Sequence, residues 1–264
     1  MAGGAVNGMK VLVIDVGNTS TGIALWRDGQ ISKPTHLNGG IIGTPQECAA
    51  AVRRAAGLTR PGKAKIDGAI LGSVVPKVNQ LWHWLVEGEL GLPLTEVRHD
   101  LKLGVTIDYP EPEKLGADRL ADACGGVARY GAPLIVADFG TALTFDCITP
   151  DQRYLGGVIA PGLPLMVDYL EQRTAQLPRV DLGGRCPPMG RSSQQAMRIG
   201  AEVGYRGMVR EIAAFLRDSM RCPEAKLVAT GGYAGWALKN SGMEYTLDPT
   251  LTLFGLGQIF RNQQ

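Results

Sequence analysis

The sequence predicts an α/β protein that contains two copies of one fold. Residues 10–26 and 133–148 begin alike: each has a run of apolar residues, an aspartate, a glycine turn and a second β-rich run. Similarity at this scale indicates an internal duplication. Between the copies, strand and helix signals alternate, which is typical of an α/β layer. We therefore expect each copy to carry a hairpin whose turn faces a ligand.

Local signals predict the remaining elements of the first copy. Residues 44–47 (T-P-Q-E) form a capping box with proline at the first helical position, and the alanine-rich helix that follows should end at Gly57. Residues 66–71 are a short apolar run, which predicts a strand. Residues 76–90 carry apolar side chains at helical spacing and predict a second helix.

The second copy is expected to follow a helix that starts near Leu115, at the junction of the copies. Residues 193–216 then show a helical apolar stripe that is interrupted by glycines. Because glycine is unfavourable inside a helix, these positions indicate either close packing against a neighbour or a break in the helix. The glycines concerned are Gly200, Gly204 and Gly207.

The last part of the chain predicts one more strand and one more helix. Residues 226–235 indicate a strand that enters a Gly-Gly turn, and residues 248–249 (D-P) should cap a helix that ends near Phe260. With the junction at Leu115, the expected organisation is a disordered leader over 1–8, an N-terminal half over 9–115 and a C-terminal half over 116–264.

Composition excludes several classes of function. The 264 residues are 45% hydrophobic and 20% charged, as in ordinary globular proteins, and a net charge of +2 without a basic stripe argues against nucleic-acid binding. Residues 1–8 contain no charged region and no apolar run long enough for a signal peptide, and no stretch approaches the roughly 18 consecutive apolar residues of a membrane span. Five scattered cysteines are best explained as free thiols in a reducing cytoplasm. We expect a cytoplasmic protein with no membrane partner.

The two turns carry the strongest chemical signal. In the first, Asp15 can hold Mg²⁺ while Asn18 and Thr19 donate hydrogen bonds to phosphate. The second, with Asp138 and Thr141, offers the same groups. One D-x-G turn is common in ordinary hairpins, but two copies after buried strands favour a cleft that holds the β- and γ-phosphates of a nucleotide from both sides.

Two glycine-rich segments are weaker signals for a nucleotide. The turn at Gly231 and Gly232 would let a base and ribose lie against backbone, and an ordinary strand-to-helix loop explains it equally well. Residues 57–64 match G-x-x-x-x-G-K, but Ala64 stands where a metal-binding hydroxyl is needed and the segment lies between a helix and a strand. We interpret residues 57–64 as a solvated loop.

Asp118 and Arg119 are candidates for catalysis and substrate orientation. Phosphorylation of an alcohol needs a carboxylate near the hydroxyl proton and a cation for an anionic substrate, and this pair supplies both. An acid at the start of a helix is also favoured by the helix dipole alone. The sequence suggests an ordinary pKa for Asp118, which makes positioning more important than basicity. Asp146 could face the same cleft or be exposed to solvent.

Other potential site residues have simpler explanations. The three histidines, His36, His83 and His99, show no spacing typical of metal ligands. Trp82 and Trp84 are expected to serve packing or an interface.

The sequence resembles the type III pantothenate kinases, the group that includes the Bvg accessory factor proteins. The resemblance extends from about Met9 over nearly the whole chain, and its motifs, taken together in this order, are highly specific. They are D-V-G-N-T at 15–19, Y-P-x-P-x-x-L-G-A-D-R at 109–119, D-x-G-T-A-x-T-x-D at 138–146, G-G-x-I-x-P-G at 156–162 and T-G-G at 230–232.

This resemblance implies transfer of the ATP γ-phosphate to the primary alcohol of pantothenate, the first step of coenzyme A synthesis. It implies the duplicated actin-like, ribonuclease H-like fold of the acetate and sugar kinase, Hsp70 and actin superfamily. It further implies a homodimer that needs Mg²⁺ and a monovalent cation, K⁺ or NH₄⁺.

The resemblance also assigns roles to individual residues. Asp118 would accept the hydroxyl proton, Asp138 would bind the monovalent cation, and Ser193 would stand in for a family threonine that touches substrate, with Ser192 in place of an asparagine. ATP would contact Asp15, Val16, Gly17, Asn18, Thr19, Ser20, Thr21, Gly22 and Thr141. Pantothenate would contact Tyr109, Gly116, Ala117, Asp118 and Arg119.

Two alternatives stay open on the sequence. Another kinase of the same fold, acting on a sugar or small acid, would share the paired turns, and only residues 109–119 argue for pantothenate. A non-catalytic ATP-binding regulator could also keep the fold. Such a regulator would be expected to lose Asp118 or a turn aspartate, and all three are present.

Overall fold

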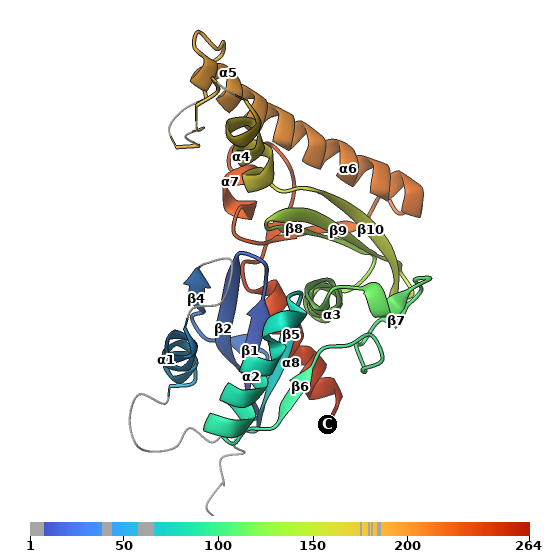
Figure 1. Cartoon of the computed structure of the whole chain (residues 1–264). Coiled ribbons are helices and arrows are strands. Elements are labelled where there is room, and N and C mark those ends of the chain that lie inside the picture. Colours follow the sequence, from blue (N-terminus) through green and yellow to red (C-terminus); the bar gives the residue numbers. More distant parts are fainter. Residues whose placement is uncertain are drawn as a thin grey trace, which may run out of the picture. The chain divides into compact units, whose positions relative to one another are not determined.

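The computed structural model describes residues 8–38, 44–57, 66–174, 176–178, 180, 182–183 and 186–264. The predicted leader lies outside these ranges except for Gly8. Two compact units make up the chain (Figure 1), one formed by Met1–Arg129 with Thr250–Gln264 and the other by Tyr130–Pro249.

The first unit is built on a mixed β-sheet with the strand order β3-β2-β1-β5-β6, and β4 also pairs with β2. β1 is antiparallel to β2 and parallel to β5, which is in turn parallel to β6. The strands are β1 (Lys10–Val16), β2 (Ser20–Arg27), β3 (Gln30–Ile31), β4 (Thr35–Asn38), β5 (Gly68–Ser73) and β6 (Leu94–Glu96).

The first helix of this unit has the expected capping, and the second forms over the expected residues. Thr44 and Glu47 form the predicted capping box: the Glu47 N–H donates to the Thr44 hydroxyl at 3.3 Å, and the Thr44 N–H donates to the Glu47 carboxylate at 2.7 Å. The helix expected over 76–90 forms in three pieces, one of them π-helical. The helical segments are α1 (Pro45–Ala55), η1 (Pro76–Val78), α2 (Asn79–His83), η2 (Trp84–Glu89), η3 (Pro112–Lys114), α3 (Ala117–Tyr130) and α8 (Leu251–Asn262), and a short strand β7 (Thr106–Ile107) precedes η3.

Close backbone packing joins α8 to α3 and to the sheet of the first unit. A Cβ atom at Gly255 would lie 1.9 Å from the Ala121 carbonyl oxygen, and one at Gly257 would lie 2.1 Å from the Trp26 ring. Side chains at these two glycines would separate the helices, so α8 packs directly on α3 and on the sheet. Both helices contribute side chains to the core of the first unit. The compact units therefore divide the chain at a different place from the halves expected on either side of Leu115.

The last helix begins later in the chain than the predicted Asp248-Pro249 cap suggests. α8 begins after Thr250, and the Thr250 side chain makes no capping hydrogen bond. The Asp248 carboxylate accepts a hydrogen bond from the Tyr130 hydroxyl at 2.9 Å. Asp248 therefore ties two segments of the second unit together.

The second unit repeats the strand order of the first. β8 is antiparallel to β9 and parallel to β11, β9 is antiparallel to β10, and β11 is parallel to β12. The order β10-β9-β8-β11-β12 thus matches β3-β2-β1-β5-β6 in sequence and direction, as the predicted duplication requires. The elements are β8 (Leu134–Phe139), β9 (Ala142–Ile148), β10 (Arg153–Pro161), α4 (Leu163–Arg173), α5 (Ser193–Ile199), η4 (Gly200–Gly204), α6 (Tyr205–Met220), β11 (Lys226–Thr230), α7 (Ala234–Leu238) and β12 (Thr246–Leu247).

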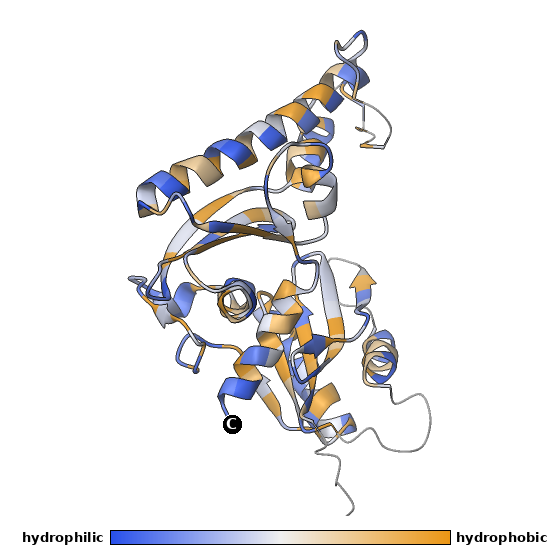
Figure 2. Ribbon diagram, turned by 180° about the vertical axis from the view of Figure 1, so that it is seen from behind, coloured by the Kyte–Doolittle hydropathy of each residue, from blue (hydrophilic) through white to orange (hydrophobic). Residues whose placement is uncertain are grey.

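The glycine-interrupted stripe forms α5, the π-helical η4 and α6. Apart from the backbone of their own helix, no described atom lies within 4 Å of a Cβ atom built at Gly200, Gly204 or Gly207, so no contact among the described residues explains these glycines. Of the two expected explanations, close packing or a break in the helix, the structure shows an irregularity: Gly200–Gly204 form the π-helical segment η4. Hydrophilic and hydrophobic residues alternate along α6 (Figure 2), as expected of a helix with one buried face.

Two further expectations concern the whole chain. All five cysteines are free, as predicted. Among the described residues, no helix has the length and apolar character needed to cross a membrane.

Candidate active site

The two predicted turns end strands with the same burial pattern. In β1 four buried residues precede a half-buried Asp15, a buried Val16 and a half-buried Gly17, and β8 repeats this order up to Asp138 and Gly140. Each aspartate is therefore held at the end of a rigid central strand. The burial of residues 11–17 matches that of residues 134–140 position by position, as the predicted duplication requires.

The hairpin loops differ by one residue and use their glycines in the same way. Val16 pairs with Thr21 in the first hairpin, whereas Phe139 pairs with Leu143 in the second. The Gly17 N–H donates to the Ser20 carbonyl at 3.0 Å, and the Gly140 N–H donates to the Ala142 carbonyl at 3.0 Å. These two glycine N–H groups are committed to the turns, so phosphate oxygens would have to be bound by neighbouring groups.

Exposure separates the predicted ATP-contacting residues of the first hairpin. Asn18, Thr19 and Ser20 are exposed at the tip, whereas Thr21 and Gly22 are buried in β2. A ligand at the turn would therefore meet the side chains of the tip first. Thr21 and Gly22 pair with β1 on one side and with β4 on the other, so their contact with ATP stays a prediction.

The first unit brings Asp118 to the end of β1. The Val74 N–H donates to the Val16 carbonyl at 3.0 Å, and a Cβ atom at Gly116 would lie 3.4 Å from the Val74 side chain and 2.5 Å from a carboxylate oxygen of Asp118. A side chain at position 116 would push the Asp118 carboxylate out of this position. The same carboxylate oxygen accepts a hydrogen bond from the Arg119 N–H at 2.8 Å.

Burial changes the chemistry of Asp118. Desolvation raises the pKa of its carboxyl group above the ordinary 3.8, although the backbone N–H and the charge of Arg119 act in the opposite direction. The ordinary pKa assumed from the sequence is therefore wrong. An aspartate with a raised pKa is a better proton acceptor, which suits a general base.

Arg119, Ala117 and Tyr109 complete the predicted substrate residues of the first unit. Arg119 is 9% exposed and Ala117 is 6% exposed, so α3 buries both close to Asp118. Tyr109 is half-buried in the loop between β7 and η3. Substrate binding by Tyr109 stays a prediction.

Two glycines of the second unit close around the Asp138 turn. A Cβ atom at Gly231 would lie 2.2 Å from an Asp138 carboxylate oxygen, and the residue has a positive φ of 89°. A Cβ atom at Gly162 would lie 2.2 Å from the Thr141 carbonyl oxygen, to which the Gly162 N–H donates at 3.1 Å. Gly232, by contrast, has open space around it. Gly162 was not among the predicted site residues, although its G-G-x-I-x-P-G motif was a signal.

The first glycines of that motif shape β10. Gly156 has a φ of 104° at an irregularity in the pairing of β9 and β10, and a Cβ atom at Gly157 would lie 1.7 Å from the Phe145 carbonyl oxygen. These two glycines allow β10 to pack closely against β9. Because β10 ends at Pro161, Gly162 follows directly and lies at the Asp138 turn.

Two tyrosines accompany the acidic residues of this hairpin. Asp146 is fully buried and accepts a hydrogen bond from the Tyr154 hydroxyl at 2.7 Å, so solvent exposure, one of its two expected placements, is wrong. Tyr205 is also fully buried; desolvation, and to a smaller extent the negative charge of Asp138, raise the pKa of its hydroxyl group.

Ser192 and Ser193 begin α5. The Ser192 hydroxyl accepts from the Gln195 N–H at 3.2 Å, and the Gln195 side chain accepts from the Arg191 N–H at 2.9 Å. Ser192 is therefore the helix N-cap, a role that asparagine fills equally well. Ser193 is exposed at the first helical position. Its contact with substrate stays a prediction.

The remaining candidates have structural roles or lie outside the described residues. Residues 58–65, most of the G-x-x-x-x-G-K segment, are not described. Trp82 is fully buried, as expected for packing, and Trp84 is 52% exposed. His83 lies between Glu87 and Glu96, at 2.8 and 2.5 Å. Within the described ranges, no three or more His, Cys, Asp and Glu side chains cluster as a metal site.

Solved structures with similar folds bind nucleotides in several cases. A Baf family transcriptional activator from Campylobacter jejuni aligns with a TM-score of 0.60 and 18% identity, covering 95% of this chain and 97% of that chain. The activator of 2-hydroxyisocaproyl-CoA dehydratase from Clostridium difficile, with bound ADPNP, has a TM-score of 0.52 at 13% identity and covers 97% and 94%. A ROK family glucokinase from Streptomyces griseus, with glucose and AMPPNP, also has a TM-score of 0.52, at 16% identity, and covers 95% and 97%. These likenesses show the predicted actin-like α/β fold.

Sequence comparison identifies the family. A type III pantothenate kinase from Akkermansia muciniphila is 48% identical over 195 residues, which are 73% of this chain and 77% of that protein. The pattern of the family described as type III pantothenate kinase matches residues 11–214. The match includes both hairpins and Asp118. The chain therefore belongs to the type III pantothenate kinase family.

Proposed function

We propose a role for each site residue in the phosphorylation of pantothenate. The family reaction transfers the γ-phosphate of ATP to the primary hydroxyl group of pantothenate, in coenzyme A biosynthesis. Asp118 accepts the proton of that hydroxyl group as the new phosphate ester bond forms. The observation that carries this role is the position of the half-buried Asp118 carboxylate, which folds back over Gly116 beside the end of β1 and accepts from the Arg119 N–H; its raised pKa agrees with the role.

The two hairpins hold ATP. Asn18, Thr19 and Ser20 donate hydrogen bonds to its phosphates from the exposed tip of the first hairpin, and Thr141 does so from the second. Val16, Gly17, Thr21 and Gly22 form the base of this hairpin and keep its tip in place for the phosphates. Gly231 and Gly232 contact the base and ribose; the support is the positive φ of Gly231 and the open space at Gly232.

Two cations would assist at the aspartates. Asp15 offers a half-buried carboxylate at the base of the turn that carries Thr19 and Ser20, and a carboxylate suits Mg²⁺ held by one side chain and nucleotide phosphates. Mg²⁺ would neutralise charge on the phosphates. Asp138 would bind the monovalent cation, K⁺ or NH₄⁺; the tight enclosure of its turn by Gly162 and Gly231 supports a fixed oxygen ligand there.

Pantothenate is held by residues around the start of α3. Gly116, Ala117 and Arg119 surround Asp118, and the guanidinium group of Arg119 gives the positive charge that orients the carboxylate of pantothenate. Tyr109 and Ser193 add contacts from a loop and from the first turn of α5.

We also propose that the enzyme is a cytoplasmic homodimer. Its free cysteines agree with a reducing compartment. The second unit exposes large apolar side chains on α4 and η4, which is a feature of interfaces. Beside them lies an apolar cavity of about 440 Å³, lined by Met166, Val167, Leu170, Val180, Ala196, Met197, Gly200 and Ala201. The exposed residues are Leu165, Tyr169, Leu170 and Val203.

Asp118→Asn tests the catalytic role. The variant should lower kcat by about two orders of magnitude or more, the contribution of a general base, while ATP binding persists. The control is Asp218→Asn, which removes an exposed carboxylate on α6 and should leave kcat unchanged. A near-normal kcat in Asp118→Asn would contradict the assignment.

A further inference from the structure

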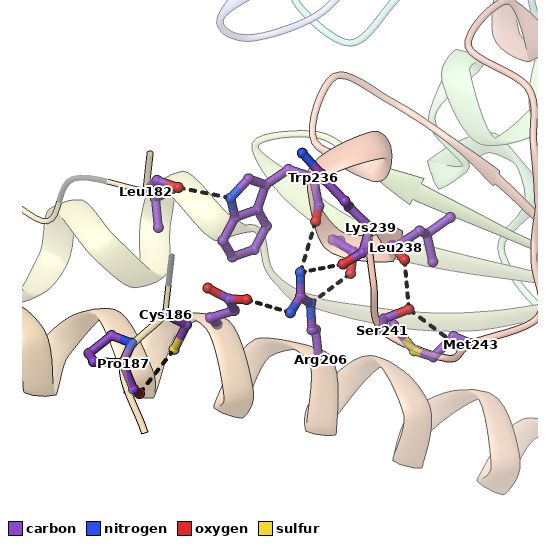
Figure 3. Close-up of polar contacts among 11 residues, drawn as sticks. Leu182, Cys186, Pro187, Arg206, Trp236, Leu238, Lys239, Ser241 and Met243 are labelled. Carbon is purple, nitrogen blue, oxygen red and sulfur yellow. Dashed lines mark hydrogen bonds and ion pairs between the residues drawn. The ribbon is translucent and has the colours of Figure 1, made fainter. Parts of the chain in front are cut away.

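Arg206 contacts three backbone carbonyls and one carboxylate. It is the second residue of α6, and its guanidinium group donates to the carbonyls of Trp236 at 3.2 Å, Ala237 at 2.9 Å and Lys239 at 2.8 Å. It also pairs with Glu202 at 2.6 Å. Figure 3 shows Arg206 reaching from α6 to these carbonyls. The two charged side chains are only 16% and 18% exposed.

These bonds satisfy the C-terminal end of α7. The last four carbonyl groups of a helix lack partners within it. Arg206 supplies partners for three carbonyls in this region, and the Ser241 hydroxyl donates to the fourth, that of Leu238, at 2.8 Å. A positive charge at this end also interacts favourably with the helix dipole. A helix as short as α7, with five residues, depends on such partners because it is not stable alone.

A second set of contacts fixes the Trp236 ring of α7. The guanidinium carbon of Arg206 lies 5.4 Å from the centroid of the Trp236 ring. The ring nitrogen donates to the Leu182 carbonyl at 3.2 Å. The C-terminal end of α7 is therefore restrained through its backbone and through a side chain.

The opposite end of α7 is attached to the Asp138 strand. The Tyr233 N–H donates to the Phe139 carbonyl at 3.0 Å, and Gly231 is pressed against Asp138 and Phe139. The Gly231-Gly232 loop thus lies between two fixed points, the end of β8 and α7. If the contacts at the C-terminal end of α7 are lost, only the contacts with the end of β8 still hold the Gly231-Gly232 loop.

We infer that Arg206 is a positioning residue that holds the Gly231-Gly232 loop, and through it the base and ribose of ATP, by anchoring α7. The inference rests on the proposed contact between this loop and ATP. It assigns no direct contact between Arg206 and a substrate.

Kinetics of Arg206→Met and Arg206→Lys test the inference. Arg206→Met should raise the KM for ATP by about tenfold, the factor that corresponds to one lost hydrogen bond to a charged group, with the KM for pantothenate changed by less than about twofold. Arg206→Lys keeps the charge but not the planar fork, so its KM for ATP should fall between those of wild type and Arg206→Met. The control is Arg210→Met, an exposed arginine on the same helix, which should behave as wild type.

Hydrogen exchange without substrates adds a second readout. In Arg206→Met the amides of residues 231–239 should exchange about tenfold faster, and those of β8 should keep the wild-type rate. If Arg206→Met does not fold, Ser241→Ala removes one partner of the Leu238 carbonyl and should raise the KM for ATP by about twofold.

The outcomes separate this inference from the proposed function. An unchanged KM for ATP in folded Arg206→Met, or an equal rise in both KM values, would overturn the positioning role. Faster exchange with an unchanged KM for ATP would also overturn it, because the loop would then not contact the nucleotide. Failure of the wild type to phosphorylate pantothenate would instead contradict the proposed function, and exchange would still test the anchoring of α7.

Discussion

Gly162→Ala should disable the Asp138 turn by a steric effect alone. The φ of Gly162 is −69°, which any residue adopts, so the backbone conformation is no obstacle. An added Cβ atom, however, would lie 2.2 Å from the Thr141 carbonyl oxygen and 2.4 Å from that of Gly140, whereas ordinary contact begins at 3.4 Å. The turn would have to retreat by about 1 Å.

That displacement sets the expected magnitude. Misplacing reacting groups by about 1 Å costs about 100-fold in rate, so kcat/KM should fall by about two orders of magnitude. Overpacking should also lower the free energy of unfolding by about 1–3 kcal/mol. A coupled assay of ADP release measures the first effect, and thermal unfolding measures the second.

Gly207→Ala is the matched control for Gly162→Ala. Among the described residues, no atom outside the backbone of α6 itself lies within 4 Å of a Cβ atom at Gly207. Alanine there should raise the free energy of unfolding by about 1 kcal/mol and leave kcat/KM unchanged. Wild-type kcat/KM in Gly162→Ala would refute the reasoning, since it would mean that Thr141 can move without consequence.

Three further predictions use pH and helix capping. Because burial raises the pKa of Asp118 and the base must be ionised, kcat/KM should fall with decreasing pH at a midpoint above 3.8; a midpoint at or below 3.8 would contradict the burial. Hydrogen bonds with Glu87 and then Glu96 raise the pKa of His83, so its stabilising effect should be complete below pH 6.5 and disappear as pH rises through the raised pKa. The difference in Tm between wild type and His83→Gln should therefore shrink with increasing pH; a constant difference would argue against the ion pairs. Ser192→Ala should lower the free energy of unfolding by about 1 kcal/mol through loss of the N-cap, and an unchanged Tm would exclude the cap.

Local signals made much of the fold predictable. The hairpins at Asp15 and Asp138 each combine a buried apolar run with a glycine turn, and both signals lie within a few residues. The capping box of α1 is equally local. Such features are predictable because the residues that determine the structure are neighbours in the sequence.

Contacts between distant segments were not predictable. Gly125 of α3 and Gly255 of α8 can lie in contact because neither has a side chain. The sequence around each glycine gives no sign of which residue it will contact. The pKa of Asp118 likewise depends on its burial in the folded protein, which no residue next to it in the sequence indicates. The sequence also marked Gly162 as part of a motif without indicating which carbonyl groups it would meet.

The most direct test of the function is a coupled assay of ADP release by the purified chain with ATP and Mg²⁺. Pantothenate, sugars and acetate are compared as acceptors, each with and without K⁺. The account predicts ADP release with pantothenate that depends on K⁺, and none above background with the other acceptors. Turnover of a sugar or of acetate without turnover of pantothenate would contradict it.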